Sequence, residues 1–212
     1  MINTYKLLSL LLSYPDEDIY KLTFEAESVL KDDQLLSSDA IEGVSEFCKF
    51  FSSRNLIEWQ EHYVQLFDYS RSVSLHLFEH LHGDSKDRGQ AMVDLIHFYE
   101  SAGFSMVKPE LPDYLPVFLE FLSLGTPENG SKMLADVIDI LGVIHHKLVA
   151  KDNPFRHLLY ALINLSAIKP NEQKIAMISS RLTEVNLDEA YQEEEPVTFG
   201  CQNSPEYKQE TR

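Results

Sequence analysis

Three histidines that could bind a metal ion, His76, His80 and His82, lie within seven residues of one another. Histidines four positions apart share one face of a helix, and their ring nitrogens can coordinate Zn²⁺. Glu79 and Asp84 stand beside them, but the segment is not an HExxH motif and shows no separate third ligand. The alternative is that these histidines are hydrogen-bonded side chains near a helix end, where partial positive charge is stabilising. A small metal-dependent hydrolase is therefore one interpretation of the sequence, and it has less support than the two interpretations given below.

No other motif for catalysis is found in the sequence. It contains neither a Gly-x-Ser-x-Gly nucleophile elbow nor the glycine patterns of nucleotide-binding loops. Cys48 and Cys201 are far apart and form no CxxC pair, so no disulfide framework is indicated, which suits a reducing cytoplasm. We therefore expect a protein that is not an enzyme and that binds no cofactor of its own.

Two segments combine aromatic and acidic side chains in a way that suits a binding surface. The first is residues 63–68 followed by Leu77–Met92, and the second is Glu110–Glu120, a proline-bounded helix start. Between Pro109 and Ser131 there are four acidic residues and no Lys or Arg. A groove that binds an amphipathic peptide needs apolar anchors, and acidic neighbours attract basic residues. The candidate peptide-binding residues are Tyr63, Phe67, Tyr114, Phe118 and Leu119 as groove walls, with Asp68, Asp113 and Glu120 as charge partners.

Each of these side chains also has a purely structural interpretation. The aromatic residues could equally belong to the hydrophobic core. Asp113 could cap the N-terminus of the following helix, with Pro116 in its first turn. Within Leu77–Met92, four residues could either shape the loop or cap a helix: His82, Asp84, Asp87 and Arg88.

The same segments carry a resemblance to a known family. The chain resembles the delta-subunit chaperones of membrane-bound nitrate reductase, within the wider group of redox-enzyme maturation proteins. The resemblance runs from the Leu7–Pro15 opening through Glu120, is most specific over Leu77–Met92, and returns at Tyr191–Phe199. The wider group's proline-Asp-His helix start is here Pro112-Asp113-Tyr114. Tyrosine replaces the histidine, so a role for that imidazole does not carry over.

The resemblance implies an all-helical protein that is not part of the finished enzyme. Such chaperones bind the N-terminal, leader-like segment of the catalytic (alpha) subunit, which is related to twin-arginine signals. They hold that subunit in the cytoplasm while the molybdenum cofactor is inserted, and cofactor-delivery proteins are further candidate partners. A helical adaptor that stays bound in a membrane redox complex is the runner-up interpretation.

Composition narrows the class of partner. The 212 residues include 34 Asp and Glu against 18 Lys and Arg, a formal net charge of −16. Such a charge repels nucleic acids and anionic lipid surfaces, and it attracts a basic segment of another protein. The most apolar run, Leu7–Leu12, is too short to span a bilayer and lacks the flanks of a signal peptide. We therefore expect a cytoplasmic protein with no nucleic-acid partner and no direct membrane insertion.

Apolar residues recur at helical spacing along the chain without an alternating strand pattern, which predicts an all-α fold. A single-domain bundle of about eight to ten helices is expected over residues 1–185, followed by an acidic, flexible tail over 186–212. Phe24 and Ile96 are expected on buried helix faces. The predicted helices are Thr4–Tyr14, Glu17–Lys31, Asp39–Ser52, a helix from Asn55 to a kink near Ser70, Val73–His82, Lys86–Ala102, Asp113–Leu124, Ser131–Lys151, Pro154–Ala167 and Asn171–Leu182.

Overall fold

The computed structural model describes residues 2–82, 86–106 and 110–180, and within them every regular element is helical. The predicted all-α fold is therefore confirmed. Asp84 and the predicted acidic tail lie outside the described residues. None of the described helices is both long and apolar enough to cross a membrane. The helices are α1 (Thr4–Leu11), α2 (Glu17–Leu22), α3 (Ala26–Asp33), α4 (Ser38–Ser52), α5 (Leu56–Tyr63), the π-helical turn η1 (Val64–Asp68), the 3-10 turn η2 (Arg71–Val73), α6 (Glu79–His82), α7 (Lys86–Ser101), α8 (Leu115–Leu122), α9 (Pro127–Ala150) and α10 (Arg156–Leu165), and residues 172–180 are helical as well.

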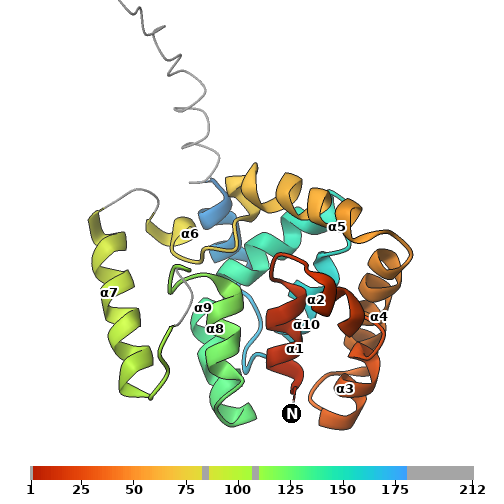
Figure 1. Cartoon of the computed structure of the whole chain (residues 1–212). Coiled ribbons are helices and arrows are strands. Elements are labelled where there is room, and N and C mark those ends of the chain that lie inside the picture. The colour runs from red at the N-terminus through yellow and green to blue at the C-terminus, as the bar shows by residue number, and fades with distance from the viewer. Residues whose placement is uncertain (1, 83–85, 107–109, 181–212) are drawn as a thin grey trace, which may run out of the picture.

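Helix α1 lies in the middle of the bundle and packs against α8 (Figure 1). Asn3 caps its first turn by accepting a hydrogen bond from the Lys6 amide. Leucines on several sides of α1 are fully buried, which is the pattern of a helix that is covered on all sides. The buried Ser9 hydroxyl donates to the Pro116 carbonyl oxygen at 2.7 Å, which ties α1 to the first turn of α8.

An aromatic cluster fills the space between α4, α5 and the start of α10. Phe51 stacks on Trp59 with ring centroids 4.7 Å apart, and Phe155 meets Phe47 edge-on at 5.0 Å. All four rings are fully buried, and large aromatic rings dominate the energetics of a core of this kind. The cluster anchors α5, whose C-terminal end leads into the candidate site.

Helix α9 begins at Pro127, earlier than the predicted start at Ser131, and its first turn is a threonine cap followed by proline. The Thr126 hydroxyl oxygen accepts the Asn129 N–H at 3.3 Å, and Pro127 is the first helical residue. Further along, a Cβ at Gly130 would lie 2.6 Å from the ring of Tyr5. Glycine at this position therefore allows α9 to approach α1 closely.

The predicted helix Glu17–Lys31 is wrong as a single element. The chain forms two helices, α2 and α3, with a turn at residues 23–25. At this turn the Thr23 hydroxyl donates back to the Tyr20 carbonyl oxygen at 2.7 Å, a bond that competes with regular helical geometry. Phe24, expected on an inner face, is 69% exposed there.

The predicted helix Val73–His82 is also wrong, and this difference shapes the site. After η2 the chain leaves helical geometry at residues 74–78 and becomes helical again at Glu79. Two backbone hydrogen bonds hold this segment against the start of α8. Leu115 N–H donates to the Leu75 carbonyl at 2.8 Å, and Leu77 N–H donates to the Asp113 carbonyl at 3.0 Å. The resulting isolated bridge pairs His76 with Tyr114.

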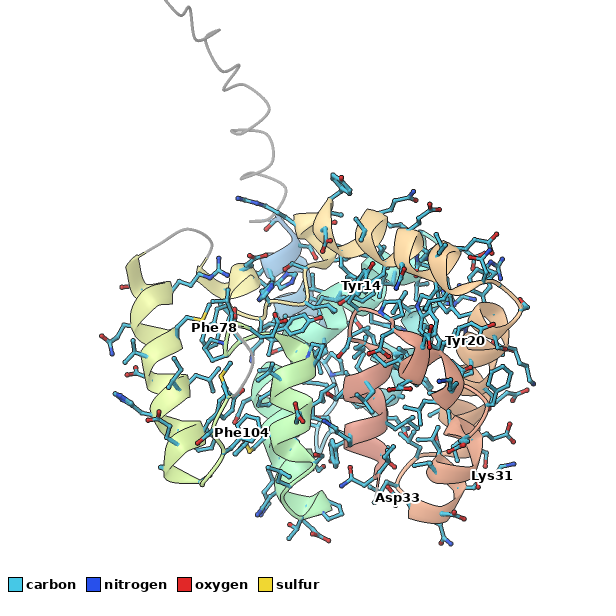
Figure 2. The ribbon with its side chains drawn as sticks, viewed as in Figure 1. Tyr14, Tyr20, Lys31, Asp33, Phe78 and Phe104 are labelled. Atoms are coloured by element: carbon cyan, nitrogen blue, oxygen red, sulfur yellow. The ribbon has the colours of Figure 1, made fainter. Side chains whose placement is uncertain are left out.

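Helix α7 stands at the edge of the bundle beside α8 (Figure 1). Gly103 follows it with φ +78°, just after the predicted helix end at Ala102. Its C-terminal end joins the body through Tyr99, whose ring lies 4.8 Å from that of Phe121. Figure 2 shows Phe78 and Phe104 between α7 and α8. Tyr99 is buried, whereas Ile96, which was expected on a buried face, is exposed, because α7 meets the body along a narrow stripe.

Candidate functional site

The candidate site is a cavity of about 510 Å³ where the end of α1, the π turn η1 and the start of α8 meet. Figure 2 shows Tyr14 where α1 and α5 come together. We call this space the tyrosine cavity, and its lining residues are Tyr14, Tyr63, Phe67, Asp68, Arg71, Ser74, Leu75, His76, Glu79, Glu110 and Tyr114.

Three tyrosines form an aromatic wall of the cavity. The Tyr63 hydroxyl donates to the Leu12 carbonyl oxygen at 3.0 Å, and its oxygen lies 2.7 Å from the Tyr114 hydroxyl. A carbonyl can only accept and a hydroxyl has one proton, so Tyr114 donates to Tyr63. Tyr14 packs edge-on against Tyr63 with ring centroids 5.7 Å apart and remains 50% exposed. These contacts hold the rings in place as an aromatic surface that is partly open to solvent.

The carboxylates of Asp68 and Glu110 add negative charge to this wall. Burial, together with the charges of Glu110 and Asp68, raises the pKa of Tyr114 to about 12. Burial is also the main cause that raises the pKa of Tyr63, and the same two carboxylates contribute. Both carboxylates therefore act on the hydroxyl pair, where they favour a cationic group. Arg71 also lines the cavity, so its charge is mixed rather than uniformly acidic.

Asp113, predicted as a charge partner for a peptide, is fully buried and is not part of the cavity lining. Its carboxylate accepts the Phe78 N–H at 3.0 Å and lies 3.4 Å from Nδ1 of His76. The alternative in which Asp113 caps α8 is wrong, because Tyr114 is the N-cap residue and no side chain caps this helix.

Three further predicted residues belong to α8 and lie away from the cavity. Phe118 and Leu119 are buried in the hydrophobic core, and Glu120 forms an ion pair with Lys6 of α1. Because α8 packs against α1, these three side chains face the core or α1 rather than the tyrosine cavity. The structure thus brings together four of the eight predicted residues, Tyr63, Phe67, Asp68 and Tyr114.

Sequence reasoning did not place Tyr14, His76 or Glu79 in a peptide-binding surface, although it considered His76 and Glu79 for a metal site. His76 and Glu79 fall within the segment that was predicted as one helix. Tyr14 lies in the connection after α1, which ends at Leu11, and it directly precedes Pro15. An aromatic residue at this junction was the available signal for a surface role.

Two histidines of the candidate metal cluster, His76 and His80, lie in different surroundings. His80 is buried, and its Nε2 donates to the Ser74 carbonyl oxygen at 2.8 Å, whereas His76 faces Asp113. Burial lowers the pKa of His80, so the neutral ring is favoured. The side chain of His82 is not among those described. Within the described part of the chain, no group of three or more His, Cys, Asp or Glu side chains is placed to hold a metal ion.

Two of the predicted loop-shaping residues, Asp87 and Arg88, lie in the first turns of α7. Asp87 is exposed. The Arg88 guanidinium donates to the Glu79 carboxylate at 3.2 Å and lies 3.9 Å from the Asp113 carboxylate. Arg88 therefore links α7 to the tyrosine cavity through Glu79, which lines it.

A second cavity of about 480 Å³ lies between α7, α8 and α9. It contains none of the predicted site residues and has a single charged lining residue, Lys132. Its lining residues are Phe98, Ala102, Phe121, Leu122, Leu124, Gly125, Asn129, Gly130, Lys132 and Met133.

Within its described residues, the chain is thus an all-helical domain whose tyrosine cavity is partly open to solvent. A crystal structure described as that of a candidate redox enzyme maturation protein from Archaeoglobus fulgidus has a similar fold. It matches with a TM-score of 0.56 and 25% sequence identity, covering 76% of this chain and 91% of that chain.

Sequence similarity then shows the family. Residues 33–159 match the family model described as nitrate reductase delta subunit. The nitrate reductase molybdenum cofactor assembly chaperones NarW and NarJ of Escherichia coli K12 are each 33% identical, over 94% and 93% of this chain and 87% of their own length. NarJ of Bacillus subtilis is 27% identical over 76% of this chain. The chain therefore belongs to the nitrate reductase delta subunit family, and the NarW and NarJ relatives given above are assembly chaperones rather than enzymes.

Proposed function

We propose that this protein is a dedicated cytoplasmic chaperone for the catalytic subunit of a respiratory nitrate reductase. It binds the N-terminal, leader-like segment of that subunit in the tyrosine cavity. While bound, it keeps the subunit available for insertion of the molybdenum cofactor before membrane assembly. The observation that carries this proposal is the open cavity in which an ordered aromatic wall stands beside the carboxylates of Asp68 and Glu110.

The cavity supports peptide binding through two separate contributions. Tyrosine rings that are already fixed in place bury apolar area of a ligand at a low entropic cost. Tyr63 is held by Leu12 and Tyr114, and Tyr14 is held by its edge-on contact with Tyr63. Apolar anchors of the client segment would rest on these rings, which sets the affinity and the dissociation rate.

The charge of the cavity and of the whole chain supports recognition of a basic segment. Asp68 and Glu110 lie near the tyrosine hydroxyls, and the chain carries a formal charge of −16. Charge of this sign attracts Lys and Arg during the encounter and orients the segment, and its influence falls as salt increases. The negative charge therefore contributes mainly to the association rate.

The test is calorimetric titration of the full-length protein with a synthetic peptide that copies the N-terminus of the nitrate reductase catalytic subunit. Binding should bury apolar area and show a negative heat-capacity change. Raising the salt concentration should slow association more than it speeds dissociation. Absence of binding at every salt concentration would overturn the proposal.

A pair of tyrosine variants tests whether the cavity is the binding site. Tyr14→Ala removes a half-exposed ring from the lining and should weaken peptide binding by about 1 kcal/mol, with a small effect on stability. Tyr69→Ala is the matched control, because this ring is 82% exposed, close in sequence to η1, and absent from the lining. Equal affinities of both variants and the natural protein would place the peptide elsewhere.

A further inference from the structure

Asp113 holds the segment that follows η2 with both its buried carboxylate and its backbone carbonyl. Its Oδ2 accepts the Phe78 N–H at 3.0 Å, and its own backbone carbonyl accepts the Leu77 N–H at 3.0 Å. Its Oδ1 lies 3.4 Å from Nδ1 of His76. One residue therefore fixes residues 76–78, although it is itself fully buried.

The segment held in this way is part of the tyrosine cavity. Leu75 and His76 line the cavity on one side of the bridge, and Tyr114, the neighbour of Asp113, lines it on the other. A shift of Asp113 would displace both segments that the bridge joins, the one around His76 and the one around Tyr114. The shape of the cavity thus depends on a side chain that does not line it.

Arg88 connects this carboxylate to helix α7. Its Nη2 lies 3.9 Å from Oδ2 of Asp113 and donates to the Glu79 carboxylate at 3.2 Å. The Arg88 side chain is 19% exposed and does not line the cavity. Its partner Glu79 does line the cavity. A single guanidinium therefore balances a fully buried carboxylate and a carboxylate of the cavity. Removing one partner of such a buried pair leaves the other charge uncompensated.

We infer that Arg88 and Asp113 are positioning residues that set the geometry of the tyrosine cavity from outside it, without touching the client peptide. The inference rests on the proposed function, because it concerns the affinity of that cavity. It also replaces the sequence-based expectation that Asp113 meets a basic residue of the client. The charge partners of the client are instead the lining carboxylates, such as Asp68 and Glu110.

The experiment measures peptide association and dissociation rates for Arg88→Met, Asp113→Asn and the double variant, over a range of salt concentrations. Each single variant should dissociate about tenfold faster, as expected when a residue acts on a site through an intervening network. The dependence of association on salt should be unchanged, because no cavity carboxylate is removed. The double variant should resemble either single variant, since the two residues act as a pair.

Hydrogen exchange supplies a readout that a loss of global stability alone would not produce. In both single variants the amides of Leu77 and Phe78 should exchange faster than in the natural protein. The buried amides of α4 and α10 should exchange only as fast as the global stability of each variant predicts. Asp33→Asn is the matched control. Its carboxylate accepts the Thr4 N–H at 2.6 Å, and Figure 2 shows Asp33 at the far end of the molecule from Tyr14. Asp33→Asn should have a lower free energy of unfolding, but the peptide should dissociate from it at the same rate as from the natural protein.

Three results would overturn the inference while the natural protein still binds the peptide. A shallower salt dependence in Asp113→Asn, with natural binding by Arg88→Met, would make Asp113 a direct contact. Natural dissociation from the folded fraction of both variants would make the pair purely structural. If neither variant folds, Arg88→Lys keeps the positive charge but loses the planar fork, and it should still dissociate faster. Natural kinetics for Arg88→Lys would then contradict the inference, whereas failure of the natural protein to bind would contradict the proposed function.

Discussion

Replacing Phe118 by alanine should lower the free energy of unfolding by about 3–5 kcal/mol. The side chain is 5% exposed and belongs to the core along α8, which packs against α1. Removing a buried phenylalanine ring forfeits about 2–3 kcal/mol of transfer free energy, and the space left behind adds the remainder. Peptide affinity of the folded fraction should change little, because Phe118 does not line the tyrosine cavity.

Urea unfolding followed by circular dichroism gives the midpoint and the slope for this variant, and calorimetry of the folded fraction gives the affinity. Phe24→Ala is the matched control, since that ring is 69% exposed and its loss should cost less than about 1 kcal/mol. A loss below about 1 kcal/mol for Phe118→Ala, combined with at least tenfold weaker binding, would refute the assignment of Phe118 to the core.

Two further predictions concern pH and a glycine. Burial lowers the pKa of His80 and of His62, so the unfolded chain binds more protons than the folded chain below the ordinary histidine value of about 6.5. Stability should therefore be level above about pH 7.5 and fall from there toward pH 5, and urea midpoints that stay constant between these values would contradict the reasoning. Gly89 lies inside α7 with nothing within 4 Å of an added Cβ. Gly89→Ala should raise stability by about 0.5–1 kcal/mol, which a lower thermal midpoint would disprove.

The parts of the fold that follow from local signals were predictable. Thr126-Pro127 marks the start of α9, and Asn55 with Glu58 forms a capping box that begins α5. The predicted helix Thr4–Tyr14 begins at the same residue as α1. In each case the information lies within one or two turns of the element that it specifies.

The site was less predictable because its geometry depends on partners remote in sequence. The segment at residues 74–78 is spaced like a helix, but hydrogen bonds from residues more than 30 positions away hold it in another conformation. Asp113 shows the same limitation. Its position before α8 resembles a cap, whereas its hydrogen-bond partner is the amide of Phe78. Aromatic residues on α8 have spacing that fits a groove or a core equally well, and only packing against α1 decides between them.

The π turn η1 makes the number of residues before the cavity part of the site. A π-helical turn closes hydrogen bonds over five residues rather than four, so it contains one residue more than a regular α-helical turn. Each residue of an α-helix turns the chain by about 100°, so a relative that lacks one residue at Val64–Asp68 would present different side chains after α5. Phe67 and Asp68 could then not both occupy their places in the lining. Comparisons of this cavity among family members should therefore align chain length across η1 before they compare residue types.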